Sequence, residues 1–276
     1  MTAPQTSKWS TKQQLWLYFI LAYAVSWLAW TPIVGYHLGW WPRLVPDWWH
    51  LLGALGPITS AFIVTALSGG RAGLKGLLAR MTRWRIGAGW LAFALFSAPL
   101  LFLLGALVTG LASGDWAVFA SFGRVDELPG LGWLAGWVLH TLSFGLGEET
   151  GWRGFALPRF QGKNTASMAT LKLGLLWAGW HIPLFAYNYT EMNLFGIIGF
   201  LVGMLSGAVV FTWLYNSTGG SILAVILWHG AYNASVAGAE GAIPMIVTAF
   251  VIAGAIFIGR RYGPENFAAR PRQVIE

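Results

Sequence analysis

The sequence predicts an all-α fold, a polytopic membrane bundle of about eight transmembrane helices with both termini on the inner side of the membrane. Two observations on composition lead to this class. Hydrophobic residues make up 56% of the chain and charged residues only 10%, whereas an ordinary soluble domain carries about 25% charged residues. The third observation is the alternation of long apolar stretches with loops of uneven charge. We expect a single integral membrane domain over residues 1–276.

Eight apolar stretches account for the predicted spans. A helix needs about 20 apolar residues to cross the hydrocarbon core, with a lower limit of about 17. The first stretch is too long for the apolar region of a cleaved signal peptide, so we predict that it is a span. The fourth and fifth are less regular, because polar residues lie at their ends. The stretches are 14–35, 50–68, 88–112, 130–147, 168–189, 193–215, 220–237 and 241–259.

Basic residues lie almost entirely in one set of segments, and this sets the predicted orientation. If the N-terminus is inside, 15 of the 17 Lys and Arg residues fall inside, and only Arg43 and Arg124 fall outside. Cytoplasmic loops carry such an excess of basic residues. The distribution explains the net charge of +7 through contact with membrane lipids and without a nucleic acid partner. The inside set is Lys8, Lys12, Arg71, Lys75, Arg80, Arg83, Arg85, Arg153, Arg159, Lys163, Lys172, Arg260, Arg261, Arg270 and Arg272.

Residues 71–86 form the one substantial segment between spans. Apolar residues recur there at three- and four-residue spacing, with basic residues between them, which is typical of an amphipathic helix on the anionic inner leaflet. A basic loop that simply obeys the orientation rule is an equal alternative. The chain has no cysteine, so disulfides, thiolate catalysis and cysteine-bound metals are excluded.

Two adjacent carboxylates, Glu148 and Glu149, follow the fourth apolar stretch. A charged side chain at the centre of the bilayer costs roughly 2.5–3.5 kcal/mol on insertion scales, so the fold must pair or use these groups. Glu149 and Arg153 are four residues apart and share a helical face, whereas Glu148 lies ~100° away around the helix. We expect Arg153 to hold Glu149 and to leave Glu148 free for chemistry. A simple ion pair at a helix end is the alternative.

Three further polar side chains lie inside apolar stretches. His181 is in the fifth stretch, and His229 and Asn233 lie one helical turn apart on one face of the seventh. Ionisable groups within a membrane normally face the bundle interior and pair with one another. We therefore expect one cluster with Glu148 and Glu149, near the inner leaflet and facing a water-filled cavity. The other histidines are expected at the interface (His37, His50) and in helix packing (His140).

Three chemistries fit such a cluster. A carboxylate and an imidazole can activate water by general base catalysis, and His and Asn side chains can donate hydrogen bonds to an oxyanion. Two His and one Glu can instead hold a catalytic Zn²⁺ with an open position for water, although the sequence lacks the HExxH pattern. A GxSxG motif is also absent from the sequence. A proton-coupled transporter would more often show inverted repeats, which we do not find.

The motifs resemble those of a known family, the CPBP or Abi group of intramembrane proteases, which includes the eukaryotic endopeptidase that trims prenylated CAAX proteins. Three family motifs, Glu-Glu-x-x-x-Arg, Phe-x-x-x-His and His-x-x-x-Asn, occur in the family's order within 130–240. Trp177 stands where the second motif has Phe, an exchange that we expect to alter the lining more than the chemistry. The matching residues are Glu148, Glu149, Trp152, Arg153, Trp177, His181, His229 and Asn233.

The resemblance implies an all-α bundle with a cavity open to the cytoplasmic side. It implies that Glu148 and His181 activate water and that His229 and Asn233 stabilise the oxyanion. Glu149, Trp152 and Arg153 would support the site. We favour a site without a metal, because Asn233 suits an oxyanion hole better than a zinc shell. In the zinc-dependent alternative, the ligands would be Glu148, His181 and His229.

The leading prediction is an intramembrane endopeptidase that hydrolyses a peptide bond in a membrane-associated substrate, either a peptide or a lipid-modified protein. A non-catalytic family member, acting as an immunity or scaffold protein, is one alternative. A small-molecule or ion transporter is the other. The Arg-preferring composition, rich in Ala, Gly and Trp, suggests a bacterial inner membrane, and the resemblance implies an active site toward the cytoplasm.

Overall fold

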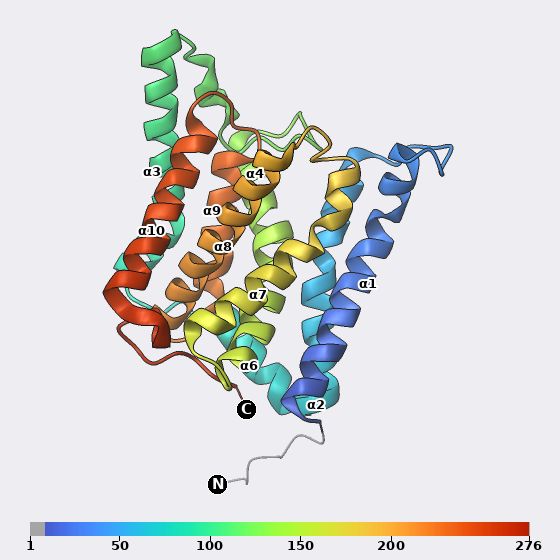
Figure 1. Ribbon diagram of the computed structural model, residues 1–276, viewed down its shortest axis with the longest axis vertical. Coiled ribbons are helices and arrows are strands. Elements are labelled where there is room, and N and C mark those ends of the chain that lie inside the picture. The colour runs from blue at the N-terminus through green and yellow to red at the C-terminus, as the bar shows by residue number, and fades with distance from the viewer. Residues whose placement is uncertain (1–8, 276) are drawn as a thin grey trace.

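The computed structural model describes residues 9–275, which form a bundle of helices (Figure 1). Helices account for 77% of the chain and the described residues contain no strand, so the all-α prediction is confirmed. Lys8, one of the basic residues counted above, lies outside the described residues. The long helices are α1 (Thr11–His37), α2 (Leu55–Met81), α3 (Ala88–Ser113), α8 (Leu194–Ser217) and α10 (Ile243–Asn266). The shorter elements are η1 (Asp47–Ala54), η2 (Ala117–Ser121), α4 (Trp133–His140), η3 (Thr141–Gly145), α5 (Leu146–Gly151), η4 (Trp152–Ala156), α6 (Leu157–Gln161), α7 (Ala166–Trp180), η5 (Ile182–Ala186) and α9 (Ile222–Val236).

Five helical segments are long and apolar enough to cross a membrane: α1, η1 with α2, α3, α8 and α10. The other predicted spans correspond to shorter elements, namely the continuous run from α4 to α6, and helices α7 and α9. The chain is therefore a polytopic integral membrane protein, and the number of eight spans stays a prediction. In Figure 1 the described chain begins and ends at the lower end of the bundle. We call this the lower end, and the end reached by His37 the upper end.

Polar residues mark where several helices begin. Ser10 and Gln13 form a reciprocal capping box at the start of α1, and the Ser221 hydroxyl accepts a hydrogen bond from the Ala224 amide at the start of α9. Asn193 accepts from the Gly196 amide in the same way at the start of α8. Such caps satisfy amide groups that have no partner within the helix. They fix the ends of helices that periodicity alone leaves uncertain.

The segment predicted as an amphipathic helix follows a sharp kink in α2. Gly70 has a φ of 56°, a left-handed conformation that favours glycine, and the helix then continues to Met81. Leu77 is buried, and the Arg80 guanidinium donates hydrogen bonds to the Gly154 carbonyl at 2.7 Å and the Tyr215 hydroxyl at 3.0 Å. The helical prediction is thus confirmed up to Met81. Contact of this helix with the membrane surface stays a prediction.

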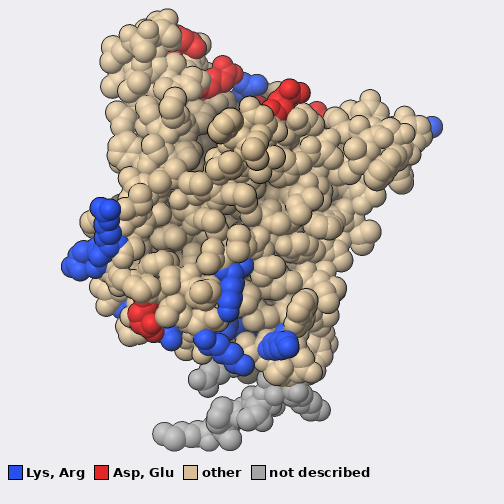
Figure 2. All heavy atoms as spheres, viewed as in Figure 1, with Lys and Arg blue, Asp and Glu red and all other residues tan. Residues whose placement is uncertain are grey.

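Charged side chains separate between the two ends of the bundle. Figure 2 shows most acidic groups at the upper end and most basic groups toward the lower end. Arg153 departs from the predicted distribution, because it is fully buried inside the bundle and does not lie in a loop. At the upper end, Arg124 pairs with Asp126 at 2.8 Å and with Glu240 at 3.3 Å.

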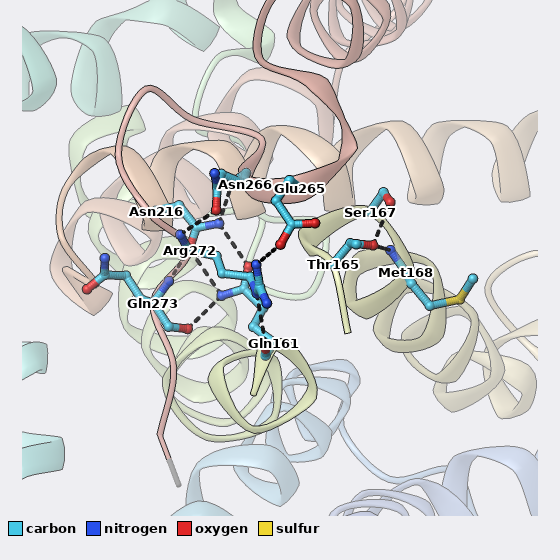
Figure 3. A network of polar contacts seen from close by, with 9 residues as sticks. All are labelled: Gln161, Thr165, Ser167, Met168, Asn216, Glu265, Asn266, Arg272 and Gln273. Carbon is cyan, nitrogen blue, oxygen red and sulfur yellow. Dashed lines mark hydrogen bonds and ion pairs between the residues drawn. The ribbon is translucent and has the colours of Figure 1, made fainter. Parts of the chain in front are cut away.

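The C-terminal segment after α10 is tied to the lower end by a polar network (Figure 3). The side-chain amides of Gln161 and Asn216 donate to each other's oxygens at 3.1 and 2.8 Å. Asn216 also donates to the Asn266 carbonyl at 2.8 Å and accepts from the Gln273 amide at 3.1 Å. Arg272 donates to the Gln161 carbonyl at 2.9 Å. The network joins α6, α8 and the segment that follows α10.

Candidate active site

The two adjacent carboxylates lie on α5, in the middle of a descending run of helix. This run is not regular: η3 before α5 and η4 after it are both π-helical. Single π-helical turns within α-helices occur frequently at functional sites. All residues from Gly147 to Ala156 are buried. The prediction of a helix that carries buried carboxylates is confirmed, whereas its π-helical turns were not foreseen.

Two glycines let this helix approach its neighbours closely. A Cβ atom at Gly145 would lie 2.5 Å from the Ile226 carbonyl oxygen of α9, and one at Gly147 would lie 2.5 Å from the Ala54 carbonyl oxygen of η1. Real Cβ atoms essentially never come so close to backbone atoms. The position next to Glu148 therefore has no room for a side chain, and the packing fixes the depth and rotation of α5.

Glu148 is held by two tryptophans through one of its oxygens. Its Oε2 accepts a hydrogen bond from the Trp177 indole at 2.7 Å and a longer one from the Trp152 indole at 3.3 Å. The side chain is 3% exposed and lines a cavity. Its other oxygen, Oε1, has no hydrogen-bond partner among the described residues, and it is not one of the fully buried polar atoms that lack a partner. One oxygen is thus fixed, and the other is free toward the cavity.

Glu149 forms a buried ion pair that also includes a histidine. Its Oε1 accepts from Arg153 Nη1 at 2.9 Å and from His229 Nδ1 at 2.8 Å. The Arg153 guanidinium also faces the Phe211 ring at 4.1 Å and the Trp177 ring at 4.5 Å. Arg153 Nε and Nη2 are buried and make no hydrogen bond among the described residues. The two aromatic rings therefore supply much of the remaining attraction to this buried cation. The structure thus contains the predicted Glu149–Arg153 pair and adds His229 to it.

His181 lies at the upper end of α7, beside the same cavity. Its Nδ1 is 2.8 Å from the Trp177 carbonyl oxygen. Because a carbonyl only accepts hydrogen bonds, Nδ1 carries the proton, and in the neutral ring Nε2 is then an acceptor. His181 is only partly buried by the protein and lines the cavity. Trp177 therefore contacts the site twice, through its indole to Glu148 and through its carbonyl to His181.

A cavity of about 1100 Å³ brings the predicted residues together. Glu148, His181, His229 and Asn233 all line it, so the residues of the predicted cluster share one cavity. The supporting residues Glu149, Trp152 and Arg153 lie behind the lining and are fully buried. No side-chain hydrogen bond to Asn233 is present among the described residues, so the amide is available toward the cavity.

The other histidines differ partly from expectation. His140 is buried and hydrogen-bonds to the Arg124 carbonyl at 3.0 Å through Nε2, as a packing residue should be. The prediction of an interfacial His50 is wrong, because its side chain is buried, contacts the Tyr187 hydroxyl at 2.7 Å and lines the cavity. Its position in η1, folded back into the bundle before α2, explains the difference.

The cavity extends to the upper end of the bundle. Its lining residues include the second half of α1, the first half of α10 and α8 from Gly199 to Phe211. Asp47 at the start of η1, and Asp126 and Glu127 in the loop before α4, also line it. Burial, together with the neighbouring Asp126 and Asp47 carboxylates, raises the pKa of Glu127. The inside N-terminus and the cytoplasmic opening of the cavity both stay predictions.

The carboxylate and imidazole side chains at the cavity do not form a metal site in this arrangement. Among residues 9–275, no three His, Asp or Glu side chains meet in a way that could hold a metal ion. Glu148 and His229 are each committed to other partners, Trp177 and Glu149 respectively. The zinc shell named in the sequence alternative therefore does not fit these side chains as they lie, and we derive no step through a metal.

The fold and the site define a class of protein: a polytopic helical membrane protein with carboxylate, imidazole and amide groups around a deep cavity. Comparison with known proteins then gives the family. Residues 130–235 match the family described as Type II CAAX prenyl endopeptidase Rce1-like, so this region of the chain is similar to that family. The match contains all three motifs, so the resemblance drawn from them is confirmed.

One curated relative supports the same assignment. The chain is 27% identical over 92 residues to CAAX prenyl protease 2 of Methanococcus maripaludis. The matched stretch covers 31% of this chain and 34% of the relative, so the chain corresponds to about a third of that protein's length. The similarity is confined to a core, and the helices outside it carry no such assignment.

Sequence reasoning missed one contact at the site. Trp177 was expected to change the lining more than the chemistry, but its indole nitrogen donates to Glu148. A Phe at this position has no donor. The signal was present in the sequence, because a Trp four residues before a histidine inside an apolar helix places an N–H group at membrane depth, where donors find partners.

Proposed function

We propose that this chain is an intramembrane endopeptidase that uses Glu148 as its general base. One observation carries the proposal: Glu148 is held at Oε2 by two indoles, and it lines the same cavity as His181, His229 and Asn233. General base catalysis needs a positioned acceptor within reach of the water that it deprotonates. A buried carboxylate fixed at one oxygen meets that need.

In the proposed first step, water binds between Glu148 Oε1 and His181 Nε2. One water proton moves to Glu148, and the water oxygen forms a bond to the carbonyl carbon of the scissile peptide. The neutral His181 ring accepts a hydrogen bond from the second water proton, because Nδ1–H is directed at the Trp177 carbonyl. His181 thereby orients the water without a change in its own charge.

The carbonyl oxygen becomes an oxyanion, which Asn233 and His229 stabilise. Asn233 donates through its side-chain amide. His229 donates through Nε2–H while its Nδ1–H donates to Glu149, so in this role both ring nitrogens carry a proton. Donors aimed at a developing oxyanion are each worth about 10²–10³ in rate. The shared Glu149 carboxylate offsets one of the two positive charges on Arg153 and His229, and the oxyanion offsets the other.

Collapse of the tetrahedral intermediate breaks the carbon–nitrogen bond. The proton taken by Glu148 passes to the leaving amine, which regenerates the carboxylate and yields an acid and an amine. No other proton source is needed. Arg153, Glu149 and Trp152 act as positioning residues, because they contact the groups at the cavity and do not line it themselves.

For the substrate, we propose a membrane-associated peptide or protein, including one that carries a prenyl group. The name of the matched family and of the curated relative supports this class. The cavity is also lined by many apolar side chains, among them Phe200, Met204 and Phe211, which suit a lipid-modified segment. The composition supports a location in the inner membrane of a bacterium.

The test is hydrolysis of a farnesylated CAAX peptide by purified full-length protein, with product formation followed in water labelled with ¹⁸O. Incorporation of one labelled oxygen into the new carboxyl group is expected from the wild type. Asn233→Ala should slow the reaction by about 10²–10³, as loss of one oxyanion donor does. Cleavage without incorporation of label, or an unchanged rate in Asn233→Ala, would contradict the assignment of roles.

A further inference from the structure

His50 and Tyr187 form a polar pair in the cavity, separate from the groups that the proposed mechanism uses. His50 Nδ1 lies 2.7 Å from the Tyr187 hydroxyl oxygen, and both side chains line the cavity that contains Glu148. They come from different elements, because His50 belongs to η1 and Tyr187 follows η5. His50 also lies outside the region that matches the family model. The three sequence motifs therefore do not account for this pair.

The His50 ring is held from three directions. Its face stacks on the Trp30 ring, with centroids 5.9 Å apart, and the Trp30 indole donates a hydrogen bond to the His50 carbonyl at 2.8 Å. Nδ1 contacts the Tyr187 hydroxyl, and Nε2 lies 3.8 Å from Glu127 Oε1. A side chain that is already fixed loses little freedom when a ligand binds. The pair is thus preorganised for a contact in the cavity.

The surroundings of His50 decide which atom of the pair remains available to a ligand. A carboxylate only accepts hydrogen bonds, so Glu127 favours a proton on His50 Nε2. Nδ1 is then an acceptor, and the Tyr187 hydroxyl donates its proton to it. The hydroxyl oxygen keeps its capacity to accept, and Tyr187 lines the cavity. The group that suits this position is therefore a hydrogen-bond donor, such as the N–H of a peptide.

The pair lies closer to the upper end of the bundle than Glu148 does. Phe144 precedes Glu148 by one helical turn, a rise of ~6 Å, and the His50 ring lies 5.9 Å from the Phe144 ring. Tyr187 follows His181 by six residues through η5, which gives a rise of at most ~12 Å. An extended peptide advances ~3.3 Å per residue. A peptide bound at Glu148 would thus meet Tyr187 about two to four residues from the scissile bond.

We propose that Tyr187, oriented by His50, is a specificity-determining residue that accepts a hydrogen bond from one backbone N–H of the bound peptide. This role rests on the proposed peptidase function, because the ligand is the substrate of that reaction. The contact fixes the register of the peptide relative to Glu148. It is made away from the reacting atoms and is equally strong before and during the reaction. Its loss should therefore raise KM and leave kcat little changed.

The test removes the two partners of this contact separately. The ligand is a fluorescent farnesylated CAAX peptide, together with a series in which one backbone amide at a time is replaced by an ester, which has no N–H. The protein is the full chain in nanodiscs with Glu148→Gln, which blocks the proposed base, and the dissociation constant is measured by fluorescence anisotropy. Tyr187→Phe is then added to this chain. Tyr189→Phe is the matched control, because Tyr189 lines the same cavity and makes no hydrogen bond to His50 among the described residues.

Tyr187→Phe should weaken binding of the all-amide peptide by about 2- to 10-fold, as the loss of one hydrogen bond does. The ester at one position should weaken binding by a similar factor, and at this position Tyr187→Phe should cause no further loss. Additive losses at every position would overturn the proposed contact, because a purely structural role of Tyr187 weakens all peptides alike. The same non-additive position in Tyr189→Phe, or the absence of peptide binding, would also overturn it.

Two variants of His50 test its part in orienting the hydroxyl. His50→Leu removes the acceptor and should weaken binding about as much as Tyr187→Phe, whereas His50→Asn, whose amide oxygen can replace Nδ1, should recover part of the loss. Unchanged affinity in His50→Leu would overturn the role of His50. Cleavage by the wild type is scored separately. Cleavage with purely additive losses would overturn the Tyr187 contact alone, and a non-additive position without cleavage would overturn the peptidase function alone.

Discussion

Trp177 donates its indole N–H to Glu148 across 2.7 Å, from α7 to α5. The same residue accepts a hydrogen bond from His181 through its backbone carbonyl. Trp177 therefore links the proposed base and the proposed water-orienting imidazole through one rigid side chain and one peptide group. The family motif has Phe at this position, so this chain adds a hydrogen bond to a framework that otherwise supplies only an aromatic ring.

The first prediction concerns this bond. Trp177→Phe keeps an aromatic ring and removes the donor, and a hydrogen bond to a charged group contributes about 1.5–3 kcal/mol. We expect kcat to fall by about 10- to 100-fold with KM little changed. Trp152→Phe is the matched control, because its bond to the same oxygen is longer, at 3.3 Å, and its loss should cost less than Trp177→Phe. A larger loss in the control would show that Trp177 does not position the base.

The second prediction concerns the buried pair. Arg153→Met leaves Glu149 without its cationic partner, and breaking a buried pair by removing one member typically costs about 3–5 kcal/mol in the free energy of unfolding. Thermal unfolding in detergent should show the loss. Glu149→Gln combined with Arg153→Met should recover part of it, because the buried carboxylate that lost its cationic partner is also removed. Arg260→Met, at an exposed position, should change stability by less than about 0.5 kcal/mol. Equal stability of Arg153→Met and Arg260→Met would contradict the proposed importance of the pair.

The third prediction concerns the C-terminal segment. Asn216→Ala removes both side-chain bonds of the Gln161–Asn216 pair and the acceptor of the Gln273 amide, so we expect a loss of about 1–3 kcal/mol in stability. Limited proteolysis should then cut residues 267–275 faster than in the wild type. The control is Gln273→Ala, because the Gln273 side chain bonds only to the exposed Pro271 carbonyl and its backbone makes the network contacts. Equal protection of both variants would mean that the network does not hold this segment.

The fourth prediction concerns metal dependence. The side chains of Glu148, His181 and His229 do not converge on a metal position among the described residues. We therefore expect peptide cleavage to survive prolonged treatment with a zinc chelator at an unchanged rate. Loss of activity in chelator, with recovery on addition of Zn²⁺, would show that the site rearranges around a metal and would contradict the metal-free mechanism.

The sequence predicted the helices better than the geometry of the site. The stretches 88–112 and 193–215 agree with α3 and α8 to within about two residues, because hydropathy over a full span is a strong signal. The run from α4 to α6 was harder to predict, because its two π-helical turns shift the residues that share a face. No residue pattern in the sequence predicts such π-helical turns.

The partners of the site residues were only partly predictable. The Glu149–Arg153 pair follows from four-residue spacing on one helix. The contacts Glu149–His229 and Glu148–Trp177 join residues 80 and 29 positions apart, which spacing rules do not reach. The position of the cavity was also not predictable from the sequence, because it depends on which residues of α1, α8 and α10 face it. Apolar residues occur along the whole of each of these helices, so hydropathy does not indicate which part lines the cavity.

The central claim is tested most directly by Glu148→Gln, which keeps the size and the hydrogen-bond acceptor toward Trp177 but cannot take a proton from water. The measurement is the rate of cleavage of a farnesylated CAAX peptide by wild type and variant at equal folded concentration. General base catalysis contributes about 10²–10⁴-fold, so the account predicts a loss of at least about 10² in kcat with an unchanged melting temperature. Cleavage by Glu148→Gln at the wild-type rate would contradict the account.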